Sequence, residues 1–191
     1  MSLAKYKEKR DFNSTPEPEG KIKKTGDQKL TFVIHRHKAS HLNYDFRLEM
    51  KGVLVSWAVP KGPSMNPADK RLAMKVEDHP LDYGTFEGEI PSGYGAGIVE
   101  IWDHGTYEHV SQPEFSKAEK LLSAGLKKGD LKITLHGRKL KGEFAIVKFG
   151  DPDKNTWLLI KHKDQYAVSI EYDSEELTSK SSPINMALKK K

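Results

Sequence analysis

The fold is decided by one stretch of the chain, His35-Arg36-His37-Lys38-Ala39-Ser40-His41-Leu42-Asn43-Tyr44-Asp45-Phe46-Arg47-Leu48-Glu49-Met50. From Asn43 onward polar and apolar residues alternate strictly, and the apolar ones are Tyr44, Phe46, Leu48 and Met50. A period of two is typical of a strand with one face on a core. The other face then carries Asp45 beside Arg47, with His37 just upstream. Carboxylate and imidazole groups can bind a metal ion and a guanidinium can bind a phosphate, so this strand indicates a metal-assisted phosphoryl site.

Short strand-like runs recur along the chain and are separated by turn residues. They span residues 31–35, 43–50, 53–59, 72–77, 97–102, 131–135, 141–148 and 157–161. One helix is expected between Glu114 and Leu126, because apolar residues recur there near helical spacing and glycines lie close to its end. Many short strands with little helix predict a mainly β (α+β) fold, either an antiparallel barrel or a sandwich.

The composition limits the class of protein. A chain of 191 residues fits one domain, and its net charge of +5 mildly favours an anionic partner such as nucleic acid. The absence of cysteine excludes disulfides and thiolate metal ligands. No apolar run approaches the roughly 20 residues that cross a bilayer, and the charged N-terminus does not read as a secretory signal. We therefore expect a soluble, cytoplasmic, monomeric protein with no membrane partner.

Three regions are expected along the chain. Residues 1–29 are rich in Lys, Glu and Pro and predict an extended N-terminal arm. Residues 30–173 contain the strand-like runs and predict the folded domain. Residues 174–191 end in three lysines and predict a disordered basic tail.

Three side chains are candidate metal ligands: His37, Asp45 and His79. A short turn can fold the eight positions between His37 and Asp45 so that both side chains converge. His79 ends a strand-like run, because Pro80 removes the chain from regular pairing there. Two imidazoles and one carboxylate leave coordination positions open for water or substrate, as in a catalytic metal site. Most of the other histidines are expected to be ordinary surface or core residues.

Two arginines are candidate phosphate ligands. Arg47 shares a strand face with Asp45, and Arg71 lies in a later strand-like run. A planar guanidinium suits a bidentate clamp on phosphate better than an ammonium does. The Tyr83 hydroxyl could donate a hydrogen bond to the same oxygens. The run Gly93–Gly97 lacks the ending of a phosphate-binding loop and predicts a tight β-turn.

These motifs together resemble the 3′-phosphoesterase domain family of ligase D, the end-joining DNA repair ligase of bacteria and archaea. The resemblance covers roughly residues 6–165, and its motifs occur in the expected order at Phe32–Glu49, Ser56–Pro63, Arg71–Ala73, Val76–Tyr83, Phe86–Gly88, Tyr94–Gly97 and Trp102-Asp103. It implies a compact antiparallel β-barrel with a few short flanking helices. It also implies a hydrolase that heals DNA 3′ ends, removing a terminal ribonucleoside by phosphodiester cleavage and then the remaining 3′-phosphate.

The resemblance also implies roles for individual residues. His37, Asp45 and His79 match the family's ligands for a divalent metal, usually Mn²⁺, with Zn²⁺ or Co²⁺ as further candidates. Arg47, Arg71 and Tyr83 match its phosphate contacts. Supporting roles in catalysis or DNA binding fall on Arg10, Asp11, Glu17, Ser56, Lys61 and Glu77.

Asn43 departs from the family pattern, which usually has a histidine that touches the scissile phosphate. An amide can donate a hydrogen bond, but it cannot carry a positive charge or deliver a proton near neutral pH. We therefore expect the phosphomonoesterase step to be weakened more than the diesterase step.

The implied substrates are DNA or DNA–RNA 3′ ends at primer–template junctions, and the implied partners are a separate DNA ligase, a polymerase or Ku. Two alternatives remain open from the residues themselves. A cupin-like non-haem iron oxygenase also uses two histidines and a carboxylate, although it has no general need for the two arginines. A nucleic-acid-binding barrel without catalysis would make the three candidate ligands structural.

Overall fold

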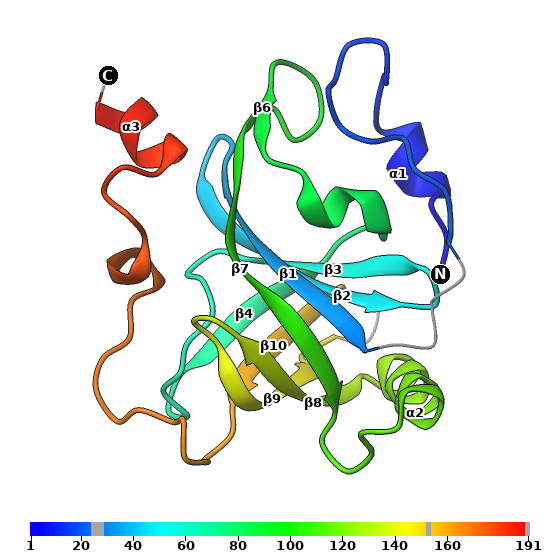
Figure 1. Ribbon diagram of the computed structural model, residues 1–191, viewed down its shortest axis with the longest axis vertical. Coiled ribbons are helices and arrows are strands. Elements are labelled where there is room, and N and C mark those ends of the chain that lie inside the picture. The colour runs from blue at the N-terminus through cyan, green and yellow to red at the C-terminus, as the bar shows by residue number, and fades with distance from the viewer. Residues whose placement is uncertain (24–28, 152–153, 190–191) are drawn as a thin grey trace.

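Eight antiparallel strands close into a barrel in the computed structural model, which describes residues 1–23, 29–151 and 154–189 (Figure 1). Their order is β1-β2-β3-β4-β10-β9-β8-β7, and β7 pairs again with β1 to close the ring. The eight strands are β1 (Leu30–Lys38), β2 (Leu42–Met50), β3 (Val53–Val59), β4 (Lys70–Lys75), β7 (Gly97–His109), β8 (Asp130–Gly137), β9 (Lys141–Lys148) and β10 (Thr156–Lys161). Two short strands, β5 (His79–Pro80) and β6 (Gly88–Ile90), pair with β3 and β7. The expectation of a barrel is confirmed.

The apolar face of the opening stretch lines the barrel interior. Tyr44, Phe46, Leu48 and Met50 are buried together with Trp57 in the main hydrophobic cluster. The polar face of β2 is therefore on the outer wall of the barrel. A second, smaller cluster of Tyr6, Val33, Leu54 and Tyr83 covers part of this wall. The outer wall of β1–β3 is thus itself buried under another layer of chain, which is why charged residues on it can be held in fixed positions.

The predicted helix is confirmed as α2 (Phe115–Lys128), which ends at Gly129 in the left-handed conformation with φ of 80°. This φ favours glycine, which stops the helix where β8 begins. Several strands differ in extent from the sequence prediction, and β7 and β4 are two of them. β7 continues to His109, because its later residues pair with β8 after its earlier ones pair with β6. β4 begins at Lys70 and ends at Lys75, so Glu77 lies beyond it.

Both terminal segments differ from the expectation of an extended arm and a disordered tail. The described part of the arm contains α1 (Ala4–Glu8) and lies over the barrel wall near η1 (Leu81–Thr85) (Figure 1). Residues 24–28 of the predicted arm are outside the described residues. The segment from Ser174 to Lys189 forms η2 (Ser174–Leu177) and α3 (Pro183–Lys189) on the opposite side of the molecule (Figure 1). It is ordered because Ser174 and Ile184 are fully buried against the barrel.

No helix among the described residues is long and apolar enough to cross a membrane.

Candidate active site on the outer wall of the barrel

A polar cavity of about 250 Å³ lies between the outer wall of β1–β3 and the layer that covers it. The wall contributes His37, Asn43, Asp45, Arg47 and Ala58, and the covering layer contributes the rest. The latter are Arg10 and Glu17 of the arm, Val76, Glu77, His79, Tyr83 and Ile90, and Tyr94 and Gly95 of the turn before β7. Residues from five separate parts of the chain therefore meet at one place.

Strand register brings the wall residues together. Asp45 lies opposite His35 on β1 and opposite Ala58 on β3. Arg47 lies opposite Ser56, one step further along the same face. Since side chains two residues apart on a strand share a face, the alternation predicted from the sequence places these groups in rows across three strands.

Asp45 is the centre of the wall. Its Oδ2 accepts a hydrogen bond from Arg47 Nη2 at 3.0 Å and lies 3.4 Å from His37 Nδ1. Its Oδ1 accepts a hydrogen bond from Asn43 Nδ2 at 2.8 Å. Burial would raise the pKa of Asp45, but Arg47 and His37 outweigh it and the pKa lies below its usual value. Asp45 is therefore an ionised carboxylate held in the cavity.

Arg47 is buried and fixed from three sides. Its Nε donates to His35 Nδ1 at 3.2 Å, its Nη1 to Ser56 Oγ at 2.9 Å, and its Nη2 to Asp45. Its guanidinium also lies 4.8 Å from the ring centre of Tyr83. Because a guanidinium has five N–H donors, these three bonds leave two that no described residue uses and that could serve a ligand.

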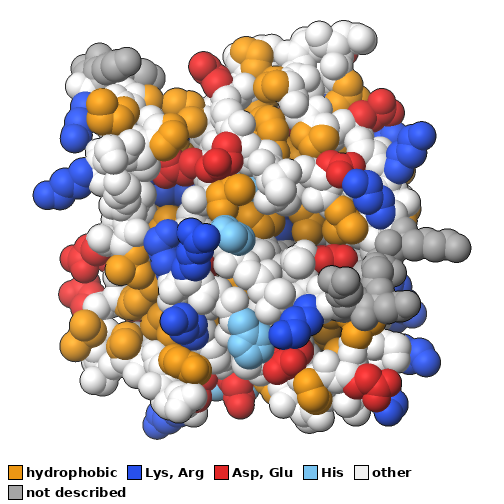
Figure 2. All heavy atoms as spheres, in the orientation of Figure 1, with side chains coloured by type: hydrophobic (Ala, Val, Ile, Leu, Met, Phe, Trp, Pro, Cys, Tyr) orange, Lys and Arg blue, Asp and Glu red, His pale blue; other side chains and the backbone are white. Residues whose placement is uncertain are grey.

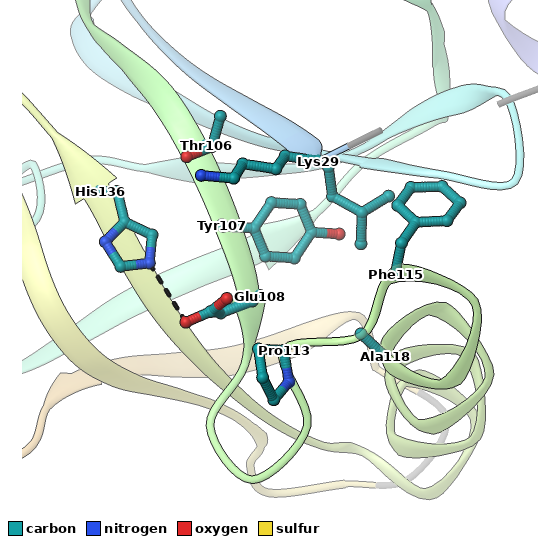
Figure 3. A pocket seen from close by; sticks show the side chains of 9 residues that line it. Lys29, Thr106, Tyr107, Glu108, Pro113, Phe115, Ala118 and His136 are labelled. Carbon is teal, nitrogen blue, oxygen red and sulfur yellow. Dashed lines mark hydrogen bonds and ion pairs between the residues drawn. The ribbon is translucent and has the colours of Figure 1, made fainter. Parts of the chain in front are cut away.

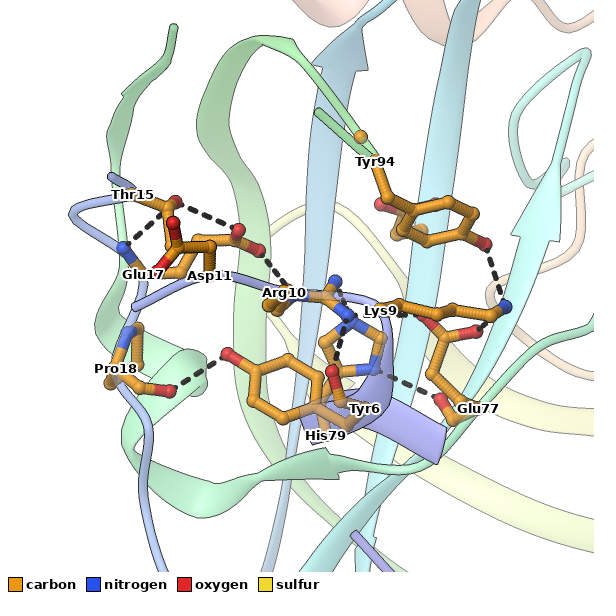
Figure 4. A network of polar contacts seen from close by, with 12 residues as sticks. Tyr6, Lys9, Arg10, Asp11, Thr15, Glu17, Pro18, Glu77, His79 and Tyr94 are labelled. Atoms are coloured by element: carbon orange, nitrogen blue, oxygen red, sulfur yellow. Dashed lines mark hydrogen bonds and ion pairs between the residues drawn. The ribbon is translucent and has the colours of Figure 1, made fainter. Parts of the chain in front are cut away.

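The arm contributes a second arginine, which is held by two carboxylates (Figure 4). Arg10 Nε donates to Glu17 at 2.9 Å and Nη1 donates to Glu77 at 3.3 Å. Its Nη2 lies 3.4 Å from His79 Nε2. Glu77 also accepts from Lys9 Nζ at 2.9 Å, so the two carboxylates of the network are each paired with cations. The two carboxylates therefore hold the Arg10 guanidinium beside the candidate ligand His79.

In both His79 and His37, one ring nitrogen lies beside a backbone carbonyl, which shows that this nitrogen carries a proton. His79 Nδ1 lies 2.9 Å from the Glu77 carbonyl, which can only accept a hydrogen bond, so Nδ1 carries the proton and Nε2 keeps its lone pair. Burial first, then Arg47 and Arg10, hold the pKa of His79 well below its usual value. In His37 the Nε2 lies 2.9 Å from the Gly95 carbonyl, so Nε2 carries a proton and Nδ1 is the ring nitrogen that faces Asp45.

The pair formed by His37 and Asp45 fits a divalent cation. His37 Nδ1 and Asp45 Oδ2 face each other at 3.4 Å, and both atoms can bind a metal ion when Nδ1 carries no proton. Two ligands that bind one ion at about 2.1 Å lie about 3 to 3.5 Å apart. A neutral imidazole, a carboxylate and the absence of thiolates suit Mn²⁺ among other divalent metals.

The third candidate ligand is not assembled with the other two. No group of three His, Asp or Glu side chains close enough to hold a metal ion occurs among the described residues. His79 lines the same cavity, but its Nε2 faces the Arg10 guanidinium. The structure therefore brings the predicted trio into one cavity without placing it in a ligand cluster.

Tyr83 lies where the two arginines and His79 meet. Its ring contacts that of His79 edge-on at 4.8 Å between centres, and it is 2% exposed. Burial raises the pKa of the Tyr83 hydroxyl strongly, so the phenol keeps its proton and can donate a hydrogen bond.

Four of the predicted site residues lie outside the cavity lining: Arg71, Lys61, Asp11 and Ser56, of which Ser56 contacts Arg47. Arg71 donates to Asp69 at 3.0 Å and to the Tyr172 carbonyl at 2.6 Å, at a separate hollow that Lys61 also lines. The structure does not place Arg71 in the cavity of Arg47, because the barrel turns that face of β4 away from the outer wall of β2. Its role as a phosphate ligand stays a prediction. Asp11 binds the backbone N–H of Asn13 at 3.0 Å and shapes the arm.

Sequence reasoning missed four residues around the site. His35 fixes Arg47 from below, and burial first, then Arg47, lowers the pKa of His35 to about 3. Lys9 and Tyr94 pair at the rim, with Lys9 Nζ 3.2 Å from the Tyr94 hydroxyl. Gly95 anchors His37 through its carbonyl. The run Gly93–Gly97 was the available signal, since its predicted turn is confirmed by the hydrogen bond from Ala96 N to the Gly93 carbonyl.

Other surface features offer less chemistry. A second hollow of about 200 Å³ between β7 and α2 is lined by Tyr107, Phe115 and Ala118, with the ion pair of His136 and Glu108 at its edge (Figure 3). On the face seen in Figure 2, Lys and Arg side chains are interspersed with Asp and Glu, and histidines lie among them. The described side chains on that face therefore do not gather into a continuous basic surface.

The fold and the cavity define a class of protein: a β-barrel whose outer wall holds a carboxylate, imidazoles and buried arginines in one cavity. Comparison with known proteins gives the family. The model of the DNA ligase D 3′-phosphoesterase domain matches residues 35–148, and the chain belongs to this family.

Curated relatives agree with this family. The chain is 48% identical over 172 residues to the multifunctional non-homologous end joining protein LigD of Pseudomonas aeruginosa, covering 88% of this chain and 19% of that protein. It is 46% identical over 165 residues to the LigD protein of Mycolicibacterium smegmatis, covering 85% of this chain and 21% of that protein. The LigD protein of Mycobacterium tuberculosis is 43% identical over 164 residues, covering 85% of this chain and 20% of that protein. This chain thus spans about a fifth of the length of these relatives.

Proposed function

We propose that the chain is a divalent-metal-dependent phosphoesterase that heals DNA 3′ ends for end joining. It would hydrolyse the phosphodiester that joins a 3′-terminal ribonucleoside and then the remaining 3′-phosphate, to leave a 3′-hydroxyl. The observation that carries this proposal is the cavity shared by Arg47, Arg10 and the facing pair of His37 and Asp45. The family membership supports the same reaction class.

The residues of the chain would bind and orient the phosphate. Arg47 has two donors that its three bonds leave over, and these would neutralise charge on the phosphate oxygens as it builds up during water attack. Tyr83 would donate its retained proton as a hydrogen bond to the same group. Arg10 would move from His79 to the phosphate while Glu17 and Glu77 keep it close. In the diesterase step, water adds to phosphorus and the bond to the ribonucleoside oxygen breaks, with a proton passing to that oxygen.

His37, Asp45 and His79 would hold the cation, for which we propose Mn²⁺, with Zn²⁺ and Co²⁺ as alternatives. Such an ion supplies Lewis-acid polarisation of a phosphate oxygen and lowers the pKa of bound water. A test separate from activity is Mn²⁺ binding, followed by the loss of the free-ion EPR signal. Wild type should bind Mn²⁺ and Asp45→Ala should not, whereas equal binding by both would contradict this assignment.

The first test of function is trimming of a 5′-labelled primer–template that ends in one ribonucleotide, with and without Mn²⁺. The structure offers a matched pair of variants, because Asp45 pairs with Arg47 at 3.0 Å and Asp69 pairs with Arg71 at 3.0 Å. Asp45→Ala should lose at least about 100-fold in rate, and Asp69→Ala should stay within about twofold of wild type. DNA binding without trimming under any divalent metal would overturn the proposal in favour of a binding module.

Asn43 affects the expected rate of the second step, which is removal of the 3′-phosphate. Its amide is committed to Asp45 Oδ1 and carries no charge. A dianionic phosphomonoester depends more on positive charge than a diester does, so Asn43→His should raise the monoesterase rate more than the diesterase rate. An unchanged ratio of the two rates would contradict this expectation.

The partners in end joining are also proposals. Since the LigD relatives carry the end-joining name and are about four to five times as long as this chain, we propose that a DNA ligase and a polymerase act on the healed end, on the same or another polypeptide, with Ku at the break. Joining of a ribonucleotide-ended break by a purified ligase, with and without this protein, would test the order of healing and sealing. We further propose a soluble cytoplasmic monomer, which sedimentation would check.

A further inference from the structure

Tyr94 is an aromatic side chain at the rim of the candidate active site that the reaction outlined above does not use. Tyr94 is 48% exposed although it lines the cavity with Arg10 and His79. The turn that carries it has glycines on either side with φ of 82° and 79°, which lets the chain present the ring at the tip. The next residue, Gly95, holds the turn to the site through its bond with His37.

Tyr94 also stands where the cavity meets a second, wider groove. This groove has a volume of about 580 Å³ and is lined by Lys5, Lys9 and Lys75, with Asp78 and Asn155 beside them. Val76, Glu77 and Tyr94 line both hollows. Tyr94 is the aromatic member of this boundary, so its ring lies beside both the groove and the cavity.

Two cations lie against the ring, and both also pair with Glu77. Lys9 Nζ lies 4.3 Å from the ring centre, and Arg10 Cζ lies 5.6 Å from it (Figure 4). An exposed aromatic ring beside lysines is the combination by which proteins bind single-stranded nucleic acid: bases stack on the ring and the cations neutralise the phosphates.

We propose that Tyr94 is the stacking platform for the unpaired base of the 3′-terminal nucleotide, and that the strand behind this base follows the groove of Lys5, Lys9 and Lys75. This inference rests on the proposed function and names its substrate more closely, as a 3′ end whose last base is unpaired. The other residues of the cavity then contact the phosphate rather than the base.

The test compares two substrates that differ in the terminal base. One primer ends in an ordinary ribonucleotide and the other ends in the same ribose without a base. Wild type should favour the first by about tenfold in kcat/KM, mainly through KM, because stacking of one base on an aromatic ring has about this strength. Tyr94→Ala should remove the preference, and Tyr94→Phe should retain it. Tyr166→Ala is the matched control, since Tyr166 is 45% exposed and lines neither hollow.

A second readout separates failure of this inference from failure of the proposed function. Placed as the terminal base, 2-aminopurine should lose fluorescence on binding wild type, Tyr94→Phe and Tyr166→Ala, and keep it with Tyr94→Ala. Quenching by wild type without any trimming would overturn the function and leave the platform in place. An equal base preference and equal quenching in wild type and Tyr94→Ala would overturn the platform, even if the enzyme trims normally.

Discussion

Two buried arginines on neighbouring strands of the barrel differ in how many of their hydrogen-bond donors have a partner. Arg36 of β1 has all five N–H groups engaged, with Glu175, Glu100, Asn185 and Ser182 as partners. Arg47 of β2 is buried to a similar degree, at 2% exposed, yet it makes three such bonds among the described residues. Both are fixed in place, but Arg47 keeps two donors that no described residue uses.

The difference follows from the face of the strand on which each arginine lies. Arg36 is on the side of β1 opposite to His35 and His37, and there it binds the C-terminal segment, whose Glu175 also accepts a hydrogen bond from Tyr44. Arg47 is on the outer wall, beside a cavity. Burial with complete pairing indicates a structural role, whereas burial with free donors toward a cavity indicates a ligand.

The largest expected effect is on stability and comes from replacing Arg36, whose five donors all have partners. Arg36→Met should lower the free energy of unfolding by about 3 to 5 kcal/mol, because it leaves Glu100 and Glu175 near a buried site without their partner. Urea denaturation would measure it. The exposed Arg138 provides the control, since Arg138→Met should change stability by no more than about 0.5 kcal/mol. Equal stability of the two variants would break the comparison.

Replacing Arg47, which keeps two donors without a described partner, should lower the rate of trimming instead. Arg47→Lys keeps the charge but loses the planar fork, so trimming of a ribonucleotide-ended primer should fall by at least about 100-fold, equivalent to about 2.7 kcal/mol. Single-turnover kinetics on protein shown to be folded by circular dichroism would measure this. If Arg36→Met lost activity at temperatures where it is folded while Arg47→Lys did not, the assignment of roles would be reversed.

Arg71 sharpens the comparison because the sequence predicted it to be a phosphate ligand. It binds Asp69 and the Tyr172 carbonyl, so Arg71→Gln should lower stability by about 1 to 2 kcal/mol while the trimming rate stays within about twofold of wild type. Thermal unfolding and the primer assay on the same preparation would show both. If Arg71→Gln lost as much trimming rate as Arg47→Lys, Arg71 would be assigned to the active site.

The smallest expected effect is a pH dependence of stability at the barrel end. Burial would raise the pKa of Glu175, but the hydrogen bonds from Arg36 and Tyr44 outweigh it and lower the pKa. The stability that this pairing gives is present above the unfolded pKa of about 4.3 and is lost as the pH falls through the folded value. Glu175→Gln should therefore be less stable than wild type at pH 7, and the difference should shrink toward pH 3. A difference that is constant with pH would exclude this linkage.

The sequence was sufficient for the local part of the site. The alternation from Asn43 to Met50 fixed which residues share a face, since side chains on a strand can only point to one side or the other. That is why Asp45, Arg47 and Asn43 lie together as predicted, and why β2 forms with its apolar face in the core. The helix up to Gly129 was equally local, because a glycine in the left-handed conformation ends it.

Only the tertiary structure decided which face of each strand borders the cavity. Leu72 and Met74 are apolar but 44% and 36% exposed, so the pattern around Arg71 could not show that its side chain turns away from the outer wall of β2. Arg10 and Tyr94 are far from Asp45 in the sequence and reach it because the arm and the turn before β7 fold over the wall. Alternation carries information over two residues, whereas strand register, barrel closure and the packing of distant segments depend on contacts that a local pattern does not contain.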